Sequence, residues 1–197
     1  MPEPPEQASP MAGAGETGGL LATKLFAPRP QLGFVSRPRL VKALNDGLAR
    51  GLVLVSAPAG FGKTALLAEW ALQRPVAWLS LDAGDNDPAR FWRHATAALD
   101  RVRPGIAQRV LPLLGPPPPS SYQGLVTALI NELAAEPDRG GVVLVLDDYH
   151  VIDSRAIHAS LTFLLEHRPL ELQLVISSPD LRGLGGLIGR LTCALSW

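Results

Sequence analysis

Cysteine, lysine and long apolar runs are scarce in this 197-residue chain. Its single cysteine, Cys193, excludes an intrachain disulfide. No apolar stretch reaches the roughly 20 residues that a membrane-spanning helix needs. The N-terminal residues MPEPPEQASP carry acidic side chains where a secretion signal has a basic and then an apolar run. We therefore expect a cytoplasmic protein with no membrane partner.

A surplus of positive charge is also missing, because 18 Lys and Arg residues balance 18 Asp and Glu residues. Proteins that bind nucleic acid neutralise its phosphates with a basic patch or stripe. We therefore expect no nucleic-acid binding by this chain alone. Hydrophobic residues make up 47% of the sequence, which is enough for one sizeable core.

Short apolar runs alternate with helical patterns along most of the chain. This alternation predicts an α/β fold with a mostly parallel sheet flanked by helices. Residues 1–19 are rich in Pro, Gly, Ala and Glu without apolar periodicity and predict a disordered leader. One domain is expected over 20–178, followed by a divergent tail over 179–197. The expected strands are 52–57, 76–81, 141–150 and 172–177, and the expected helices are 37–51, 64–72, 87–102, 122–135 and 157–167.

The segment SAPAGFGKTALL, residues 56–67, joins the first expected strand to a helix. Ligands of such sheets bind beyond the carboxyl ends of the strands. Gly60 and Gly62 permit a loop whose backbone N–H groups surround an anion at the start of the helix. Lys63 would reach the β- and γ-phosphates of a nucleotide, and the Thr64 hydroxyl would ligate Mg²⁺. The expected nucleotide contacts are Ala59, Gly60, Phe61, Gly62, Lys63 and Thr64.

One position departs from the usual phosphate-loop spacing, G-x-x-x-x-G-K-[ST], which places glycine where this chain has Ala57. Pro58 pushes the residue before it toward extended backbone, which alanine adopts without strain. The first glycine is therefore dispensable if the loop begins extended.

A second motif, VVLVLDD, is an apolar strand that ends in Asp147 and Asp148, the form of a Walker B element. The first carboxylate would hold Mg²⁺, directly or through water, and the second would polarise an attacking water. Two acids can also simply end a strand in solvent. The presence of a phosphate loop in the same chain favours the functional interpretation.

Four segments together resemble one protein family: TKLFAPRPQLGFVSRPRL, LVSAPAGFGKTALLAEW, WLSLDAGDNDPARFW and LVLDDYHVI. They are similar to the MalT-type large ATP-binding regulators of the LuxR class, within the STAND branch of the ASCE P-loop NTPases. The resemblance covers about residues 21–178, and an alanine at the start of the loop is typical of that family. It implies a domain that binds ATP or ADP with Mg²⁺ and acts as a slow switch for transcription. Sensing and DNA binding would then belong to other domains.

The resemblance adds a candidate base-binding segment, because FVSRPRL matches the family's stretch that lines the adenine. Val35 and Arg37 are the residues it implies. An ordinary helix entry capped by Ser36 is an equally open interpretation.

Two features of the family are missing near the end of the sequence. An arginine usually follows the fourth strand, whereas this chain has Pro179, with Ser178 as a weak polar substitute. The family's fifth strand is also expected to be lacking, which suggests a truncated regulator and leaves strand 52–57 as an apolar edge. The alternation of Leu191, Cys193, Leu195 and Trp197 could instead supply a substitute strand.

Three functions remain open at this point. The leading prediction is an ATP- or ADP-binding switch that is at most a slow ATPase, with self-association or regulator partners open. A small P-loop kinase acting on a small molecule is the alternative, for which Arg182 and Arg190 would have to serve a lid. An AAA-like motor would need an arginine finger and a second sensor that the sequence does not reveal.

Overall fold

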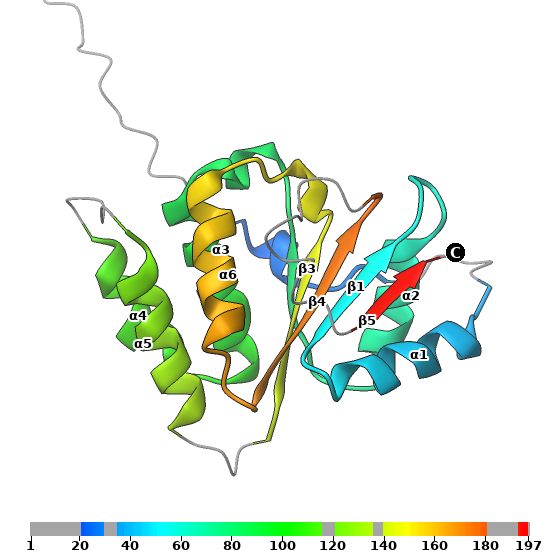
Figure 1. Cartoon of the computed structure of the whole chain (residues 1–197), viewed down its shortest axis with the longest axis horizontal. Coiled ribbons are helices and arrows are strands. Elements are labelled where there is room, and N and C mark those ends of the chain that lie inside the picture. Colours follow the sequence, from blue (N-terminus) through cyan, green and yellow to red (C-terminus); the bar gives the residue numbers. More distant parts are fainter. Residues whose placement is uncertain (1–20, 30–34, 116–120, 136–139, 181–192, 197) are drawn as a thin grey trace, which may run out of the picture.

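A parallel sheet of five strands forms the centre of the computed structural model (Figure 1), which describes residues 21–29, 35–115, 121–135, 140–180 and 193–196. The strand order is β2-β3-β4-β1-β5, and every pair of neighbours is parallel. The expected leader, residues 1–19, lies outside the described residues. The strands are β1 (Leu52–Ser56), β2 (Ala77–Ser80), β3 (Val142–Asp147), β4 (Leu172–Ser178) and β5 (Cys193–Ser196).

Helices cover both faces of this sheet (Figure 1). One face carries α1 (Pro38–Leu48) and α2 (Lys63–Ala71). The other carries α3 (Pro88–Val102), α4 (Ile106–Val110), α5 (Gln123–Ala134) and α6 (Arg155–Glu166). The predicted α/β fold and the predicted strands and long helices are confirmed. The short helix α4 lies in a segment for which no element was expected.

Alternation along the strands divides the core into two layers. Leu52 and Leu54 of β1 face the α3–α6 side, whereas Val53 and Val55 face α1 and α2. In the neighbouring strands, too, successive buried side chains belong alternately to one core layer and to the other. A strand that is buried on both faces has a continuous apolar sequence. The run LVLV could therefore be recognised as a buried strand from the sequence.

The expectation that a fifth strand is lacking was wrong. Strand β5 pairs with β1 from Val53↔Cys193 to Ser56↔Ser196, so β1 lies between β4 and β5. Leu195 packs against the core layer of α1 and α2, as the alternative of a substitute strand required. Leu191 and Trp197 of the same alternation lie outside the described residues.

Local signals explain where the elements begin and end. Asp87 caps α3 by accepting a hydrogen bond from the backbone N–H of Arg90 at 2.7 Å, and Pro88 occupies the first turn. The third strand ends at Asp147 and not at residue 150, because residues Tyr149–Val151 form a 3₁₀ turn, η5. Within the described part of the chain, no helix is both long and apolar enough to cross a bilayer.

Candidate nucleotide site

The segment between β1 and α2 forms an open loop at the carboxyl end of the sheet. Gly60 and Gly62 have φ angles of +82° and +79°, a region that favours glycine. A Cβ atom at Gly60 would meet no heavy atom within 4 Å, so the loop leaves room at that point. Asp148 is the one described non-glycine residue with a positive φ, so Ala57 needs no glycine-like backbone.

Lys63 is the first residue of α2, and its buried side chain turns back onto the loop. Its ammonium group donates to the carbonyl oxygen of Ala57 at 2.7 Å and to that of Pro58 at 3.3 Å. The positive charge therefore lies within the loop, at the N-terminus of a helix whose dipole also favours an anion.

Thr64 and Asp147 bring the two predicted motifs together. The Thr64 hydroxyl donates to Oδ2 of Asp147 at 2.9 Å, and the Ser177 hydroxyl donates to Oδ1. Burial raises the pKa of Asp147, the nearby Asp148 carboxylate raises it further, and the two hydroxyl hydrogen bonds oppose this shift. Ser177 was missed in the sequence, although its place at the end of an apolar strand was a usable signal.

The donor set at Asp147 suits Mg²⁺ bound together with a phosphate. Mg²⁺ commonly takes one or two protein oxygens and completes its shell with water and substrate phosphates. Thr64 and Asp147 supply a hydroxyl and a carboxylate oxygen beside the phosphate loop. Among the described residues no group of three or more His, Cys, Asp or Glu side chains could hold a metal by itself.

Asp148 directly follows this buried carboxylate but lies in a different environment. Its backbone is left-handed (φ 59°, ψ 40°), and its N–H donates to the Ser177 hydroxyl at 2.9 Å. Its side chain is 47% exposed and lies 3.9 Å from the Nδ1 atom of His150. A half-exposed carboxylate beside the metal candidate can contact water, as the predicted role requires.

Asn86 holds the far end of the loop that Asp148 begins. Its side chain donates to the carbonyl oxygen of Val151 at 2.6 Å and accepts from the N–H groups of Asp153 and Ser154 at 2.7 and 3.1 Å. Asn86 ends a 3₁₀ turn, η2 (Ala83–Asn86), that Asp82 caps. No role for Asn86 was expected from the sequence, because these three partners lie 65 or more residues away in the chain.

The candidate base-binding segment reaches the phosphate loop through Arg37. The guanidinium Nη1 donates to the carbonyl oxygen of Phe61 at 3.2 Å. Val35 is 75% exposed. Ser36 does not cap α1, which corrects that interpretation: Arg37 is the N-cap residue, and Ser36 donates instead to Glu69.

The polar substitute considered after β4 is already engaged. Ser178 is buried, and its hydroxyl donates to the carbonyl oxygen of Asp180 at 2.6 Å. Arg182 and Arg190, which the kinase alternative requires, lie outside the described residues.

A parallel sheet with a glycine-rich loop, a lysine at the helix start and a Thr–Asp contact between the start of that helix and the end of β3 defines a P-loop NTPase domain. The family model described as the AAA ATPase domain matches residues 34–177. The chain belongs to this family, and its matched region is related to the MalT regulators.

Curated relatives agree with this assignment over most of the chain. The HTH-type transcriptional regulator MalT of Cronobacter sakazakii is 36% identical over 167 residues, which are 84% of this chain and 18% of that protein. The serine/threonine-protein kinase PknK of Mycobacterium tuberculosis is 36% identical over 175 residues, 86% of this chain and 15% of that protein. The chain therefore spans less than a fifth of these two relatives.

A solved structure shows the same fold. The STAND protein with a tetratricopeptide repeat sensor from Pyrococcus horikoshii superposes with a TM-score of 0.63 at 19% identity, covering 86% of this chain and 24% of that one.

Proposed function

We propose that this domain binds ATP or ADP with Mg²⁺ at the loop 57–64 and serves as a nucleotide-dependent switch. The observation that carries the proposal is the 2.9 Å hydrogen bond between Thr64 and Asp147, which joins the phosphate loop to the acidic strand. The two residues are 83 positions apart in the sequence. An ordinary strand–turn–helix unit would not need a contact between its helix start and a second acidic strand at the carboxyl edge of the sheet.

The residues of the loop have separate roles in this proposal. N–H groups of the loop over Ala59, Gly60, Phe61 and Gly62 surround the phosphates, and Lys63 exchanges its two carbonyl acceptors for phosphate oxygens. Thr64 and Asp147 hold Mg²⁺, which neutralises the phosphate charge when bound. Asp148 orients an attacking water, and Val35 and Arg37 lie on the base side.

Hydrolysis is proposed to be slow or absent. Stabilising the charge that develops on the transferred phosphate normally requires a cation or strong donor near it. Ser178, whose hydroxyl is engaged, ends β4, and Pro179 follows it where the family resemblance implies an arginine. A nucleotide that stays bound for a long time suits a switch.

The regulatory context comes from the relatives and goes beyond this chain. MalT is named as a transcriptional regulator, and this chain matches 18% of it. We propose that the domain is the nucleotide-binding part of a LuxR-class regulator that acts in the cytoplasm. DNA binding then belongs to another domain, in agreement with the balanced charge of this chain.

Calorimetric titration with Mg·ATP and Mg·ADP tests the proposal on the wild type, Lys63→Ala and Lys42→Ala. Lys42 is a matched control, because it is a helix lysine whose side chain is 77% exposed and forms an ion pair with Asp46. Binding by the wild type and Lys42→Ala, with loss in a folded Lys63→Ala, is expected. Equal affinity in all three proteins would contradict the site.

A small-molecule kinase remains a second candidate from the sequence analysis. The kinase activity in the name of PknK is a statement about that protein, of which this chain spans 15%. ADP formation and phosphate release, both measured with and without candidate acceptors, separate the two functions, because a kinase forms ADP without releasing phosphate. Acceptor-dependent consumption of ATP would favour the kinase.

A further inference from the structure

Glu69 connects the phosphate-loop helix to the segment before α1. It lies on α2, which begins at Lys63 directly after the loop. Its carboxylate accepts a hydrogen bond from the Ser36 hydroxyl through Oε1, and Oε2 lies 3.5 Å from the backbone N of Arg37. Both contacts cross more than 30 residues of sequence, so they fix where this segment lies on the fold.

The segment that Glu69 holds also contacts the loop directly. Arg37 donates from Nη1 to the carbonyl oxygen of Phe61, and its Nη2 atom would lie 3.9 Å from a Cβ atom at Gly62. Residues 36 and 37 are thus attached to α2 at one side and to the phosphate loop at the other. Val35 and Ser36 have no regular secondary structure, and Ser36 is held by its contact with Glu69. Arg37 is held in addition by the start of α1, because its carbonyl oxygen accepts from the N–H groups of Leu40 and Val41 at 2.9 and 3.1 Å.

Two large apolar side chains are exposed on the two segments that Arg37 joins. Val35 is 75% exposed, and Phe61 is 51% exposed. A purine base presents flat apolar faces that such side chains can cover, with polar groups only at its edge. The phosphates, by contrast, are bound by the loop backbone, Lys63 and Thr64.

From this arrangement we propose that Glu69 is a positioning residue for the base side of the nucleotide site. It holds residues 35–37 where Val35 and Arg37 can meet the base, and it does so without touching the ligand. The proposal rests on the nucleotide-binding function given above. It predicts that Glu69 affects the affinity for a nucleoside triphosphate and leaves the affinity for the phosphates alone unchanged.

The test compares Mg·ATP with Mg·tripolyphosphate, which has the phosphate chain and no base or ribose. Both are titrated calorimetrically into the wild type, Glu69→Ala, Ser36→Ala and the double variant. We expect the dissociation constant for Mg·ATP to rise about tenfold in Glu69→Ala and about threefold in Ser36→Ala, the size of one or two lost hydrogen bonds. The dissociation constant for Mg·tripolyphosphate should stay within about twofold.

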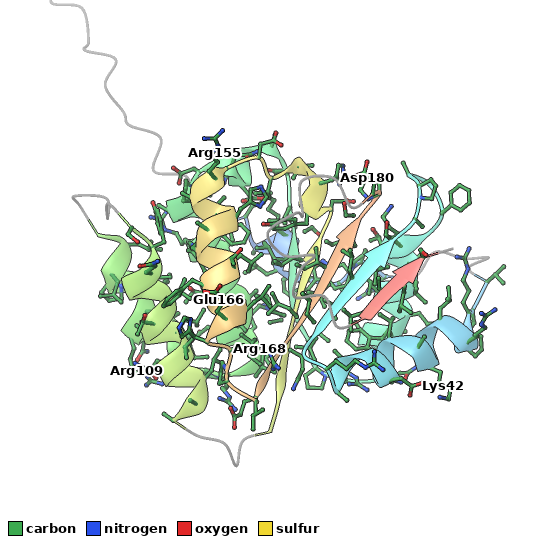
Figure 2. All side chains as sticks on the ribbon, viewed as in Figure 1. Lys42, Arg109, Arg155, Glu166, Arg168 and Asp180 are labelled. Atoms are coloured by element: carbon green, nitrogen blue, oxygen red, sulfur yellow. The ribbon has the colours of Figure 1, made fainter. Side chains whose placement is uncertain are left out.

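The double variant shows whether the two side chains act through their mutual contact. If Ser36 works only by donating to Glu69, the double variant should bind Mg·ATP no more weakly than Glu69→Ala. Glu166→Ala is the matched control, because Glu166 is an exposed helix glutamate at the end of α6, across the sheet from α2 (Figure 2). Its affinity for both ligands should equal that of the wild type.

Each other outcome overturns a defined part of the proposal. Equal losses for Mg·ATP and Mg·tripolyphosphate in Glu69→Ala would show that Glu69 supports the loop in general and not the base side. An unchanged affinity for Mg·ATP in Glu69→Ala would remove its role. A wild type that binds both ligands equally would exclude base recognition while leaving the phosphate site intact, and a wild type that binds neither would overturn the proposed function as well. If Glu69→Ala does not fold, Ser36→Ala alone decides, and an unchanged affinity for Mg·ATP overturns the proposal.

Discussion

The imidazole Nδ1 of His94 lies 2.8 Å from Oδ1 of Asp85, and neither side chain is exposed to solvent. The second carboxylate oxygen of Asp85 accepts from the Lys24 ammonium group and, at 3.0 Å, from the backbone N–H of Asp82. Burial would raise the pKa of Asp85. The hydrogen bonds from His94, Lys24 and Asp82, together with the charge of Lys24, outweigh burial and lower this pKa to about 2.

Acid should therefore destabilise the domain through Asp85. Because its folded-state pKa lies below the ordinary value of 3.8, the ionised carboxylate stabilises the fold above about pH 4. This contribution is lost as the pH falls through about 2, and amounts to roughly 2 kcal/mol in full and about half of that at pH 3. Urea unfolding at pH 6 and pH 3 should show a smaller loss in Asp85→Asn than in the wild type.

Asp46→Asn serves as the control for this measurement, because Asp46 is 64% exposed on α1. Its unfolding free energy should follow the wild-type pH dependence. An Asp85→Asn protein with the same pH dependence as the wild type would show that Asp85 does not carry this acid sensitivity.

Lys24 should be among the most sensitive cationic positions for stability. It lies in the 3₁₀ turn η1 (Ala22–Leu25), its side chain is 8% exposed, and its ammonium group also lies 2.8 Å from the Asp82 carboxylate. Lys24→Met would remove the nearer of the two cations beside the buried Asp85 and leave Arg90, whose Nε lies 3.6 Å from Oδ1, at a cost of about 3 kcal/mol in unfolding free energy. Lys42→Met, at an exposed ion pair, should cost no more than about 0.5 kcal/mol. Similar losses in both variants would contradict this difference.

The elements and the phosphate loop were predictable because their signals are local. An apolar run such as LVLV, the Asp87–Pro88 start of a helix and the GKT of the loop each act within a few residues. Ser177 could be recognised as a polar residue at the end of an apolar strand, but its partner could not be predicted. The contacts of Asn86 and Glu69 were hidden for the same reason, because they depend on which strand ends and helices become neighbours. Lys24 was equally hidden, since a lysine in a sequence carries no sign of its burial.

The C-terminal segment gives a second example of a contact that the sequence alone could not decide. The alternation around Leu195 suggested a substitute strand at the edge of strand 52–57, but it could not decide between that strand and a missing one. Pairing is a long-range property, and the missing resemblance after residue 178 favoured the wrong expectation of a sheet without a fifth strand.

Asn86 should stabilise the loop that carries Asp148. Removing its amide leaves the N–H groups of Asp153 and Ser154 and the carbonyl oxygen of Val151 without this partner. Asn86→Ala should lower the unfolding free energy by about 2 kcal/mol. Any ATP hydrolysis measured for the wild type should also fall, with little change in the dissociation constant for ATP, because the phosphate loop is untouched.

The matched control for this variant is Asn131→Ala, at an exposed position of α5. It should change neither stability nor nucleotide binding measurably. A stability loss as large in Asn131→Ala, or none in Asn86→Ala, would contradict the role of the Asn86 side chain.

The pairing of β5 with β1 should protect an otherwise exposed apolar edge. Leu195 faces the core layer of α1 and α2, whereas Ser196 is exposed. Leu195→Asp places a charge at a half-buried position against that layer and should weaken the attachment of β5, because the apolar contact is lost and the carboxylate is partly desolvated. The freed edge of β1 then offers unpaired backbone groups next to apolar side chains, which favours association between copies.

Thermal unfolding and light scattering should show a lower melting temperature and aggregation for Leu195→Asp and for a chain ending at Asp180, but not for Ser196→Asp. Unchanged melting and solubility in all three would mean that β5 contributes nothing to the sheet.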